Sequence, residues 1–291
     1  MELVSFEPKT VKSYFLPYKE TRIIPIGDIQ YGSTTDVERL KKYFSWGLKQ
    51  NVYFLGMGDY LDIGSPSNRR VISSVRGSLY DSIRKGFDEK FGAQIDELKD
   101  ILKPTRGRWL GLLRGHHYWE FEDGTETDSR LAEYLNCPLL GDCGVIILRM
   151  RHSATHGYID AKIWAHHGPF SGSAQLETAP LTRLEHVTKK FYADVYCVGH
   201  YHKKGVTVMP WIDYQVGPTG KIRMTGRNRY LVACGAFLRS YEQESVNAFG
   251  RPAGGYAEKG MLGPTALGAP MIMLRPVISD GYTRIDINVS V

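Results

Sequence analysis

Cysteine is scarce in this sequence, because the chain of 291 residues contains only four. Cys137, Cys143, Cys197 and Cys234 show no close paired spacing and form no Cys-x-x-Cys motif. This pattern excludes a disulfide scaffold and a zinc site built from paired thiolates. We therefore expect a reducing, cytoplasmic setting.

Long apolar runs are also missing. No stretch approaches the roughly 18 apolar residues that a membrane-spanning helix needs. The N-terminal segment has acidic residues early and no continuous apolar core, so we expect neither a signal peptide nor a membrane protein. Internal repeats, low-complexity tracts and a clear linker are absent as well, and we expect a single domain over residues 1–291.

The composition that remains is that of an ordinary globular protein, with 42% hydrophobic and 23% charged residues. A chain of this length buries about three quarters of its unfolded surface in one core. The net charge of +6 mildly favours a polyanionic partner.

Short apolar runs recur through the first 200 residues, and each ends at a segment of glycine and polar residues. Such runs are typical of buried strands, and amphipathic patterns over residues 35–48, 78–102 and 177–191 predict helices between them. Thr35 and Glu38 have the spacing of a capping box at the first helix start. The alternation predicts a layered α/β domain. The runs are residues 23–26, 52–57, 109–113, 162–165 and 195–198.

Two further regions have strand patterns without helices between them. Residues 145–149 and 162–165 flank a polar turn and predict a hairpin. The last 90 residues are rich in Gly, Pro and short strand patterns at 230–234, 271–274 and 282–289. We expect residues 205–291 to add antiparallel strands and a long loop to the same domain.

Polar residues with metal-binding chemistry follow the apolar runs. In α/β sheets, ligands bind outside the carboxyl ends of strands, so these segments are expected to share one rim. Carboxylate oxygens and imidazole nitrogens suit borderline divalent ions such as Mn²⁺, Fe, Zn²⁺ or Ni²⁺. Each motif alone is more often a simple turn, but the five together favour a metal site. They are Gly27-Asp28-Ile29-Gln30, Gly58-Asp59-Tyr60-Leu61-Asp62, Gly115-His116-His117, Ala165-His166-His167-Gly168 and Gly199-His200-Tyr201-His202.

The order of these motifs, from Asp28 to His202, resembles that of calcineurin-like metallophosphoesterases. The resemblance implies a β-sandwich of two mixed sheets flanked by helices. It also implies a dinuclear centre of two divalent ions at one edge, with Mn²⁺ as the first choice and Fe, Zn²⁺ or Ni²⁺ as alternatives. Two positions depart from the family pattern. Gln30 stands where the family has a metal-binding His, and a Gln carbonyl oxygen binds more weakly than imidazole; His116 stands where the family has Asn.

When the ligand positions of the family are carried over to this sequence, the resemblance implies two metal ions, with Asp59 as the ligand that they share. The first metal takes Asp28, Gln30, Asp59 and His202, and the second takes Asp59, His116, His166 and His200. We prefer His166 to His167 as the ligand because the family usually uses the first His of this segment. His167 and Arg114 are then expected to contact substrate.

His117 is the candidate to protonate the leaving oxygen or to stabilise the developing charge. In many relatives an acidic residue follows this His and orients it, but here Tyr118 follows. Asp62 or Glu120 is therefore the expected partner. The alternative for His117 is a structural neighbour of the metals without a catalytic role.

Two observations on positively charged side chains bear on the substrate class: an arginine is absent from the second motif, and two basic segments are present. Gly58–Gly64 also resembles the second motif of serine/threonine phosphoprotein phosphatases, but Ile63 stands where those have a phosphate-gripping Arg. A dianionic monoester benefits most from such a clamp, so its absence favours diesters. Two basic segments, interleaved with aromatic residues, favour nucleic acid, although a solvated surface explains them equally well. The cations are Lys203, Lys204, Lys221, Arg223, Arg227 and Arg229, and after the second motif Arg69, Arg70 and Arg76.

The sequence therefore predicts a metal-dependent phosphodiesterase, with DNA or RNA as its substrate and partner. One alternative is a phosphomonoesterase that acts on phosphoprotein or nucleotide. The other is a catalytically degenerate member of the family that binds partners, an interpretation that Gln30 favours.

Overall fold

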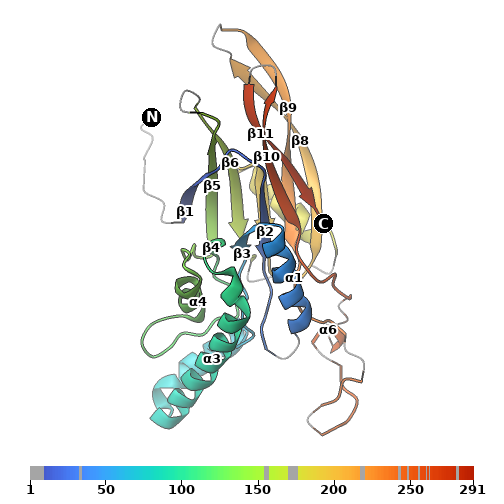
Figure 1. Cartoon of the computed structure of the whole chain (residues 1–291). Coiled ribbons are helices and arrows are strands. Elements are labelled where there is room, and N and C mark those ends of the chain that lie inside the picture. Colours follow the sequence, from blue (N-terminus) through green and yellow to red (C-terminus); the bar gives the residue numbers. More distant parts are fainter. Residues whose placement is uncertain are drawn as a thin grey trace, which may run out of the picture.

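Two mixed β-sheets face each other across an apolar layer, and helices cover their outer faces (Figure 1). This arrangement confirms the predicted class, an α/β sandwich of two mixed sheets flanked by helices. The structure is a computed structural model. It describes residues 10–32, 35–153, 157–169, 176–216, 220–241, 244–247, 249–254, 256–259, 261, 263–279 and 282–291.

The five-stranded sheet has the strand order β11-β10-β2-β3-β4. Its strands β2 (Thr21–Ile26), β3 (Tyr53–Gly56) and β4 (Trp109–Leu112) are mutually parallel. The strands β10 (Met271–Ser279) and β11 (Tyr282–Ser290) join it as an antiparallel hairpin. Parallel neighbours need long crossovers, and α1 (Val37–Lys49) and α3 (Asp81–Leu102) lie on those crossovers.

The six-stranded sheet has the strand order β1-β5-β6-β7-β9-β8. The predicted hairpin is present as β5 (Cys143–Arg151) and β6 (Tyr158–His166), which are antiparallel. β7 (Val195–Val198) runs parallel to β6, and α5 (Ala179–Thr188) lies between them in the chain. The remaining strands are β1 (Val11–Leu16), β8 (Lys204–Val216) and β9 (Ile222–Cys234).

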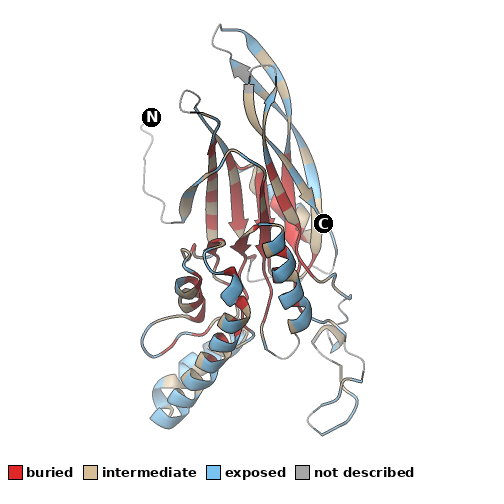
Figure 2. Ribbon diagram, viewed as in Figure 1, coloured by how far each residue is buried: buried red, intermediate tan, exposed pale blue. Residues whose placement is uncertain are grey.

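The central strands are buried on both faces, which explains their continuous apolar runs. On β2, Ile23 belongs to the layer between the sheets, whereas Ile24 packs with the helices on the outer face. On β3, Leu55 and Phe54 divide between the two sides in the same way. Figure 2 shows burial concentrated where the sheets face each other, while the outer ends of the long hairpins are exposed.

The helix that begins after the first motif is capped by a different residue from the predicted one. Asp36 is the N-cap of α1, and its carboxylate accepts a hydrogen bond from the backbone N–H of Arg39 at 3.0 Å. The hydroxyl of Thr35 instead donates to the carbonyl of Gln30 at 2.6 Å. The capping-box prediction was therefore wrong, because Thr35 holds the loop that carries Gln30.

Several short elements connect the layers. The sequence did not predict α2 (Pro66–Val75) and α4 (Thr127–Leu135). The remaining helical segments are α6 (Tyr256–Lys259) and the 3₁₀ turns at Arg76–Ser78 and Lys103–Thr105. None of the described helices combines the length and the apolar character that a bilayer crossing requires.

The C-terminal strands complete both sheets. β10 and β11 are antiparallel as predicted, but β9 lies parallel to β7 inside the six-stranded sheet. β8 and β9 form a long antiparallel hairpin that extends beyond the neighbouring strands, away from α1 and α3 (Figure 1). The prediction of purely antiparallel additions was wrong for β9, because its apolar half continues the buried middle of the sheet.

Candidate metal centre

The five motifs meet at one edge of the sandwich. Three of them follow the parallel strands β2, β3 and β4, and two lie at the carboxyl ends of β6 and β7 in the facing sheet. The ligand atoms of His116, His167 and His200 lie within 4.8 Å of one another, and so do those of Asp28, Asp59 and His167. The expected convergence at the strand ends is thus present in the structure.

The backbone at this edge adopts conformations that most residues avoid. Nine non-glycine residues in the described part of the chain have positive φ angles, and five of these nine belong to the motifs. Left-handed backbone costs energy for most residues with a Cβ atom, although Asp and His adopt it more readily than others, and such conformations gather at functional sites. The five are Asp28, Gln30, Asp59, His200 and His202, with φ of 50°, 42°, 53°, 65° and 53°.

Asp59 is fully buried and uses its two oxygens for different purposes. Oδ1 accepts hydrogen bonds from the backbone N–H groups of His116 and His117, the second at 2.9 Å. Oδ2 faces His167, with 3.1 Å between Oδ2 and Nε2. One oxygen thus fixes the loop after β4, while the other points into the cluster.

Asp28 divides its oxygens in the same manner. Oδ2 accepts a hydrogen bond from the backbone N–H of His200 at 2.9 Å. Oδ1 is buried, has no hydrogen-bond partner among the described residues, and lies 3.5 Å from Nε2 of His202. A buried, unsatisfied carboxylate oxygen costs free energy unless a cation or donor meets it, so this atom fits a metal ligand.

Two glycines of the motifs permit these close approaches. A Cβ atom on Gly115 would lie 2.0 Å from the backbone nitrogen of Asp59. On Gly58, where φ is +94°, it would lie 2.5 Å from Nδ1 of His167. Any side chain at either position would therefore push apart the loops that carry the ligands.

The structure places His167, and not His166, in the cluster. Nδ1 of His167 donates to the carbonyl of Met57 at 2.7 Å, and its buried Nε2 faces Asp59 without a hydrogen-bond partner. His166 turns to the other side of β6, where its ring stacks on Trp164 with centroids 5.7 Å apart. Side chains alternate along a strand, so the two histidines point to opposite sides. The prediction had placed His166 among the ligands and His167 at the substrate, whereas the cluster of possible ligand atoms contains His167.

Gln30 and His202 lie together beside the two carboxylates. Nε2 of the Gln30 amide lies 3.5 Å from Oδ2 of Asp59 and 3.5 Å from Nε2 of His202. The oxygen and nitrogen of an amide are exchanged by a half-turn of the side chain. After such a half-turn, the Gln30 carbonyl oxygen would lie beside Asp59 and His202, where it could act as a ligand.

His117 lies next to the cluster and pairs with Asp62. Nδ1 lies 3.3 Å from Oδ1 of Asp62, and Nε2 lies 4.0 Å from Oδ2 of Asp59. Burial by itself lowers the pKa of His117, but the carboxylates of Asp62 and Asp59 outweigh burial and raise it. Of the two predicted partners, the structure brings Asp62 to the imidazole, whereas Glu120 contributes its backbone carbonyl to Arg76.

The electrostatics of the cluster suit a cation. Burial lowers the pKa of His116 to about 3, helped by the neighbouring imidazole of His167. Burial also opposes protonation of His167, yet Asp59 and Asp28 raise the pKa of His167 to about 9. Carboxylates that favour a buried imidazolium favour a divalent ion in the same place. Oxygen and imidazole donors of this number match Mn²⁺, Fe, Zn²⁺ or Ni²⁺.

Arg114 lies in an ion-pair network. Its guanidinium lies 3.1 Å from Asp142 and 3.1 Å from Glu126, and these carboxylates raise its pKa despite burial. Both neighbours occupy the donors that a substrate would need. The structure therefore does not bring Arg114 into the cluster, where it had been predicted to contact substrate.

Most of the basic residues after the last motif are paired, or lie far from the cluster. Lys203 is buried in a 2.5 Å ion pair with Glu177, and Arg227 pairs with Asp213 at 3.3 Å. Arg229 is buried, and its guanidinium stacks on the ring of Trp211 at 3.8 Å. A strand rises about 3.3 Å per residue, so Arg223 lies roughly 35 Å along β9 from the end that faces the cluster.

Two buried polar side chains support the loops and were not predicted. Asp128 of α4 accepts a hydrogen bond from the backbone N–H of Gly115 at 3.0 Å, and burial raises its pKa to about 7. The hydroxyl of Tyr60 accepts from Gly58 at 3.1 Å and donates to the carbonyl of Leu113 at 2.9 Å. Tyr60 belongs to the second motif, so a role for its hydroxyl could have been predicted from the sequence. Asp128 lies in α4, a helix that the sequence did not predict.

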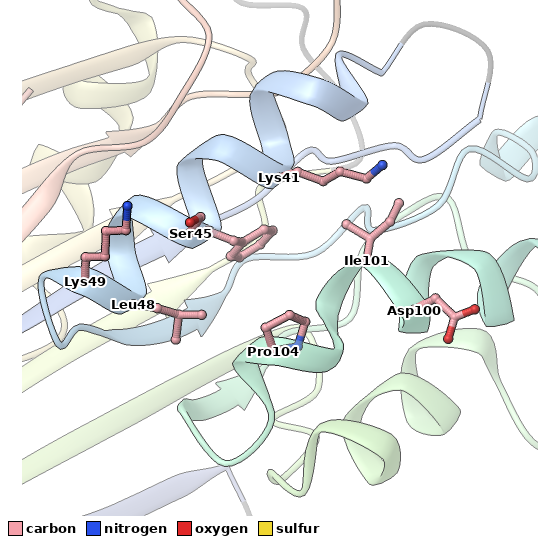
Figure 3. Close-up of a pocket in the computed structure, with 8 residues that line it drawn as sticks. Lys41, Ser45, Leu48, Lys49, Asp100, Ile101 and Pro104 are labelled. Atoms are coloured by element: carbon pink, nitrogen blue, oxygen red, sulfur yellow. The ribbon is translucent and has the colours of Figure 1, made fainter.

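Two hollows lie away from the metal ligands. A cavity of about 620 Å³ lies between α1 and the end of α3 (Figure 3). It is lined by apolar side chains such as Phe44 and Ile101, with Lys41 and Lys49 among its polar lining residues. A polar cleft of about 680 Å³ lies between the β8–β9 and β10–β11 hairpins, and includes Asp194 and Arg284. Neither contains a residue of the five motifs.

No protein-family model and no curated protein matches this sequence. Solved structures that resemble it include Vacuolar Protein Sorting 29 (Vps29) from Cryptosporidium parvum, with a TM-score of 0.35 and 12% identity over 94% of this chain and 98% of the other. Vps29 from Chaetomium thermophilum has a TM-score of 0.35 and 13% identity over 93% and 95% of the two chains. A single mutant of Vps29 from Entamoeba histolytica has a TM-score of 0.34 and 13% identity over 93% and 99%. Because these values are low, the evidence for the metal centre comes only from the positions of the residues in this chain.

Proposed function

We propose that this protein is a metal-dependent phosphoester hydrolase with phosphodiesters as its substrates. The observation that carries the proposal is the meeting of two buried aspartates and three histidines at one sandwich edge, with His117 beside them. Two-metal sites of this donor type catalyse in-line displacement at phosphorus. A structural role alone explains neither the unsatisfied Oδ1 of Asp28 nor the left-handed backbone at Gln30.

The residues divide into two ligand sets that share Asp59. Asp28, Gln30, Asp59 and His202 would hold one ion, and Asp59, His116, His167 and His200 would hold the other. When bound, the two divalent ions supply Lewis acidity, which neutralises charge on phosphoryl oxygens and makes water a nucleophile near neutral pH. His167 takes the place in this set that the sequence had given to His166.

His117 is the proton donor to the leaving oxygen. Asp62 lies on the Nδ1 side of its ring and so orients the imidazole, while Nε2 remains on the side of Asp59. A carboxylate at Nδ1 fixes the tautomer and favours the protonated ring, which is the form that a general acid needs. Asp62 is therefore a positioning residue for His117.

The preference for diesters is supported by the position of Ile63. Its side chain packs against the apolar cluster of Phe91 and Trp119, so the second motif offers no cation to a phosphoryl group. Of the two basic segments, α2 reaches the metal centre, because Arg69 donates to the backbone carbonyl of His116. A nucleic-acid substrate would therefore be held along α2 rather than along β9.

A second candidate function is binding of a partner without catalysis, and Gln30 favours it. An amide in place of an imidazole weakens one ligand set, and a chain with one weak site is closer to losing hydrolysis. The pair of His117 and Asp62 favours catalysis, because a carboxylate beside an imidazole at the edge of the ligand cluster supports the protonated ring that a general acid needs.

The deciding experiment is a substrate panel on metal-stripped protein reloaded with Mn²⁺, Zn²⁺, Fe²⁺ or Ni²⁺. The panel contains bis(4-nitrophenyl) phosphate, 4-nitrophenyl phosphate, and labelled single- and double-stranded DNA and RNA. We expect metal-dependent hydrolysis of the diester, lost in Asp59→Asn and kept in the matched control His166→Ala. Clear preference for the monoester identifies a phosphomonoesterase, and metal-bound protein without any hydrolysis identifies the partner-binding alternative.

A further inference from the structure

We propose that Arg69 of α2 is the phosphate-binding residue of this centre, and that it grips two non-bridging oxygens of the phosphoryl group beside the metals. This inference rests on the proposed function, but it assigns a residue outside all five motifs. The ligand it recognises is a tetrahedral phosphoryl anion, in an ester substrate or as free phosphate.

Arg69 touches the metal centre through the backbone. Its Nη1 donates to the carbonyl oxygen of His116, whose imidazole belongs to the cluster, and to the carbonyl of Gly64 at 3.2 Å. The chain from Asp62 to α2 is short, and Ser65 caps the helix by accepting from Asn68. The guanidinium of Arg69 is thereby held against the backbone of His116, whose imidazole is one of the proposed metal ligands.

Aromatic stacking fixes the plane of this guanidinium. Cζ of Arg69 lies 4.0 Å from the centre of the Tyr118 ring, and Cζ of Arg114 lies 5.1 Å from the same ring. Arg114 is itself held by Asp142 and Glu126. Cation–π contacts of this kind stabilise a cation by about 0.5–1 kcal/mol at exposed sites. The stack orients Arg69 before any substrate arrives, which lowers the entropy cost of binding.

One edge of the guanidinium stays available. Both hydrogen bonds of Arg69 use Nη1. Within the described ranges, Nε and Nη2 of Arg69 have no hydrogen-bond partner and no carboxylate within 4.0 Å, and neither atom is among the buried unpartnered groups. An arginine offers two parallel N–H groups along such an edge, which match two oxygens of a phosphate.

The neighbouring arginines differ from Arg69 in this respect. Arg76 donates to the carbonyl of Glu120 and pairs with Asp88 at 3.7 Å. Arg114 directs all three of its guanidinium nitrogens at the carboxylates of Asp142 and Glu126. Arg70 is exposed on the same helix and makes no hydrogen bond or ion pair with the described residues. Arg70 is therefore a matched control, since it carries the same charge one position along without contact to the centre.

Arg69 also alters the substrate argument. Ile63 leaves the second motif without a cation, but Arg69 supplies one from α2. With Arg69 as the phosphate-binding residue, the preference for diesters therefore rests on the arginines of α2 as a nucleic-acid surface and no longer on Ile63. A dianionic monoester gains more from a bidentate clamp than a monoanionic diester does. Loss of the guanidinium should therefore raise the KM for the monoester more than the KM for the diester.

The test compares metal-loaded full-length wild type with Arg69→Gln, Arg69→Lys and the control Arg70→Gln. Inorganic phosphate is the probe, measured by calorimetric titration, and metal content is measured by mass spectrometry. Loss of a charge-assisted bidentate contact weakens phosphate binding about 10- to 100-fold. We expect this loss in Arg69→Gln, an intermediate value in Arg69→Lys, unchanged affinity in Arg70→Gln, and the wild-type metal content in all three.

Each outcome decides the assignment. Wild-type phosphate affinity in metal-replete Arg69→Gln overturns it. If Arg69→Gln loses metal, Arg69→Lys decides, because its ammonium can still donate to the His116 carbonyl: tenfold weaker phosphate binding supports the assignment, and unchanged binding overturns it. If wild type hydrolyses no ester yet binds phosphate through Arg69, the proposed function fails while the phosphate site stands. If wild type hydrolyses esters and Arg69→Gln binds phosphate normally, the proposed function stands and the assignment of Arg69 fails.

Discussion

Nε2 of His167 lies 3.1 Å from Oδ2 of Asp59, and both side chains are almost completely buried. His167 follows β6 of the six-stranded sheet, and Asp59 follows β3 of the five-stranded sheet. The pair therefore joins the two sheets at the edge where their strands end. A metal held by this pair would bind to both halves of the sandwich.

The two adjacent histidines should respond differently to substitution. His167→Ala removes an imidazole from the cluster and leaves Asp59 without its buried partner, so we expect loss of one bound ion in metal titrations. His166→Ala removes a ring that stacks on Trp164, and metal stoichiometry should remain that of wild type. The reverse result, with metal lost in His166→Ala alone, would show that the sequence-based choice was right.

His117→Ala should lower turnover of the diester by roughly 10²–10⁴-fold, which is the usual contribution of a general acid. Metal content should stay unchanged, because the imidazole faces Asp62 and the edge of the cluster. Asp62→Asn should lower turnover by a smaller factor of about 10–100, typical of a residue that orients another. Wild-type turnover in His117→Ala would remove its assignment as the acid.

The ligand set that includes Gln30 should bind its ion more weakly than the set that includes His116. Calorimetric titration with Mn²⁺ is therefore expected to show two unequal affinities. Gln30→His supplies an imidazole beside His202 and should tighten the weaker site. Two equivalent sites in the wild-type protein would contradict this prediction.

Metal binding should stabilise the fold measurably. An ion at 100 times its dissociation constant raises the free energy of unfolding by about 2.7 kcal/mol. We expect the melting temperature to rise on addition of Mn²⁺ to the stripped protein and to fall again with chelator. Asp59→Asn is expected to abolish this difference, because Asp59 serves both ligand sets. A Mn²⁺-induced rise of equal size in Asp59→Asn would place the bound ion elsewhere.

Tyr60→Phe should destabilise the protein through its buried hydroxyl. The change leaves the N–H of Gly58 and the carbonyl of Leu113 without this partner, which costs about 1–3 kcal/mol. Urea unfolding of the stripped protein measures the effect apart from metal binding. Tyr31→Phe is the control, since that hydroxyl bonds Glu97 at the surface and its loss should be small.

The strands that carry the centre were predictable because they are buried on both faces. In the sequence, such strands appear as short continuous apolar runs. The polar residues that follow each run mark the ends of β2, β3, β4, β6 and β7. Their convergence then follows from the geometry of parallel strands. The choice between His166 and His167 was beyond this reasoning, because a shift of one residue exchanges the faces of a strand.

The elements around the metal centre, α2 and the β8–β9 hairpin, could not be predicted in the same way. α2 contains three serines, an asparagine and two valines, which are weak helix formers, so it escaped prediction. The position of Arg69 beside His116 depends on that helix. The direction of the β8–β9 hairpin is likewise set by pairing with β7, and that pairing decides that Arg223 lies far from the motifs.

The left-handed backbone at five of the motif residues limits how this centre can change. An alanine at Asp28 or Asp59 adds a strain of roughly 1–2 kcal/mol to the loss of the carboxylate. Asparagine and glycine accept this conformation. A lineage that abandons metal binding while keeping its fold would therefore pass through Asn or Gly at these positions, and the same two residues give the cleanest laboratory variants.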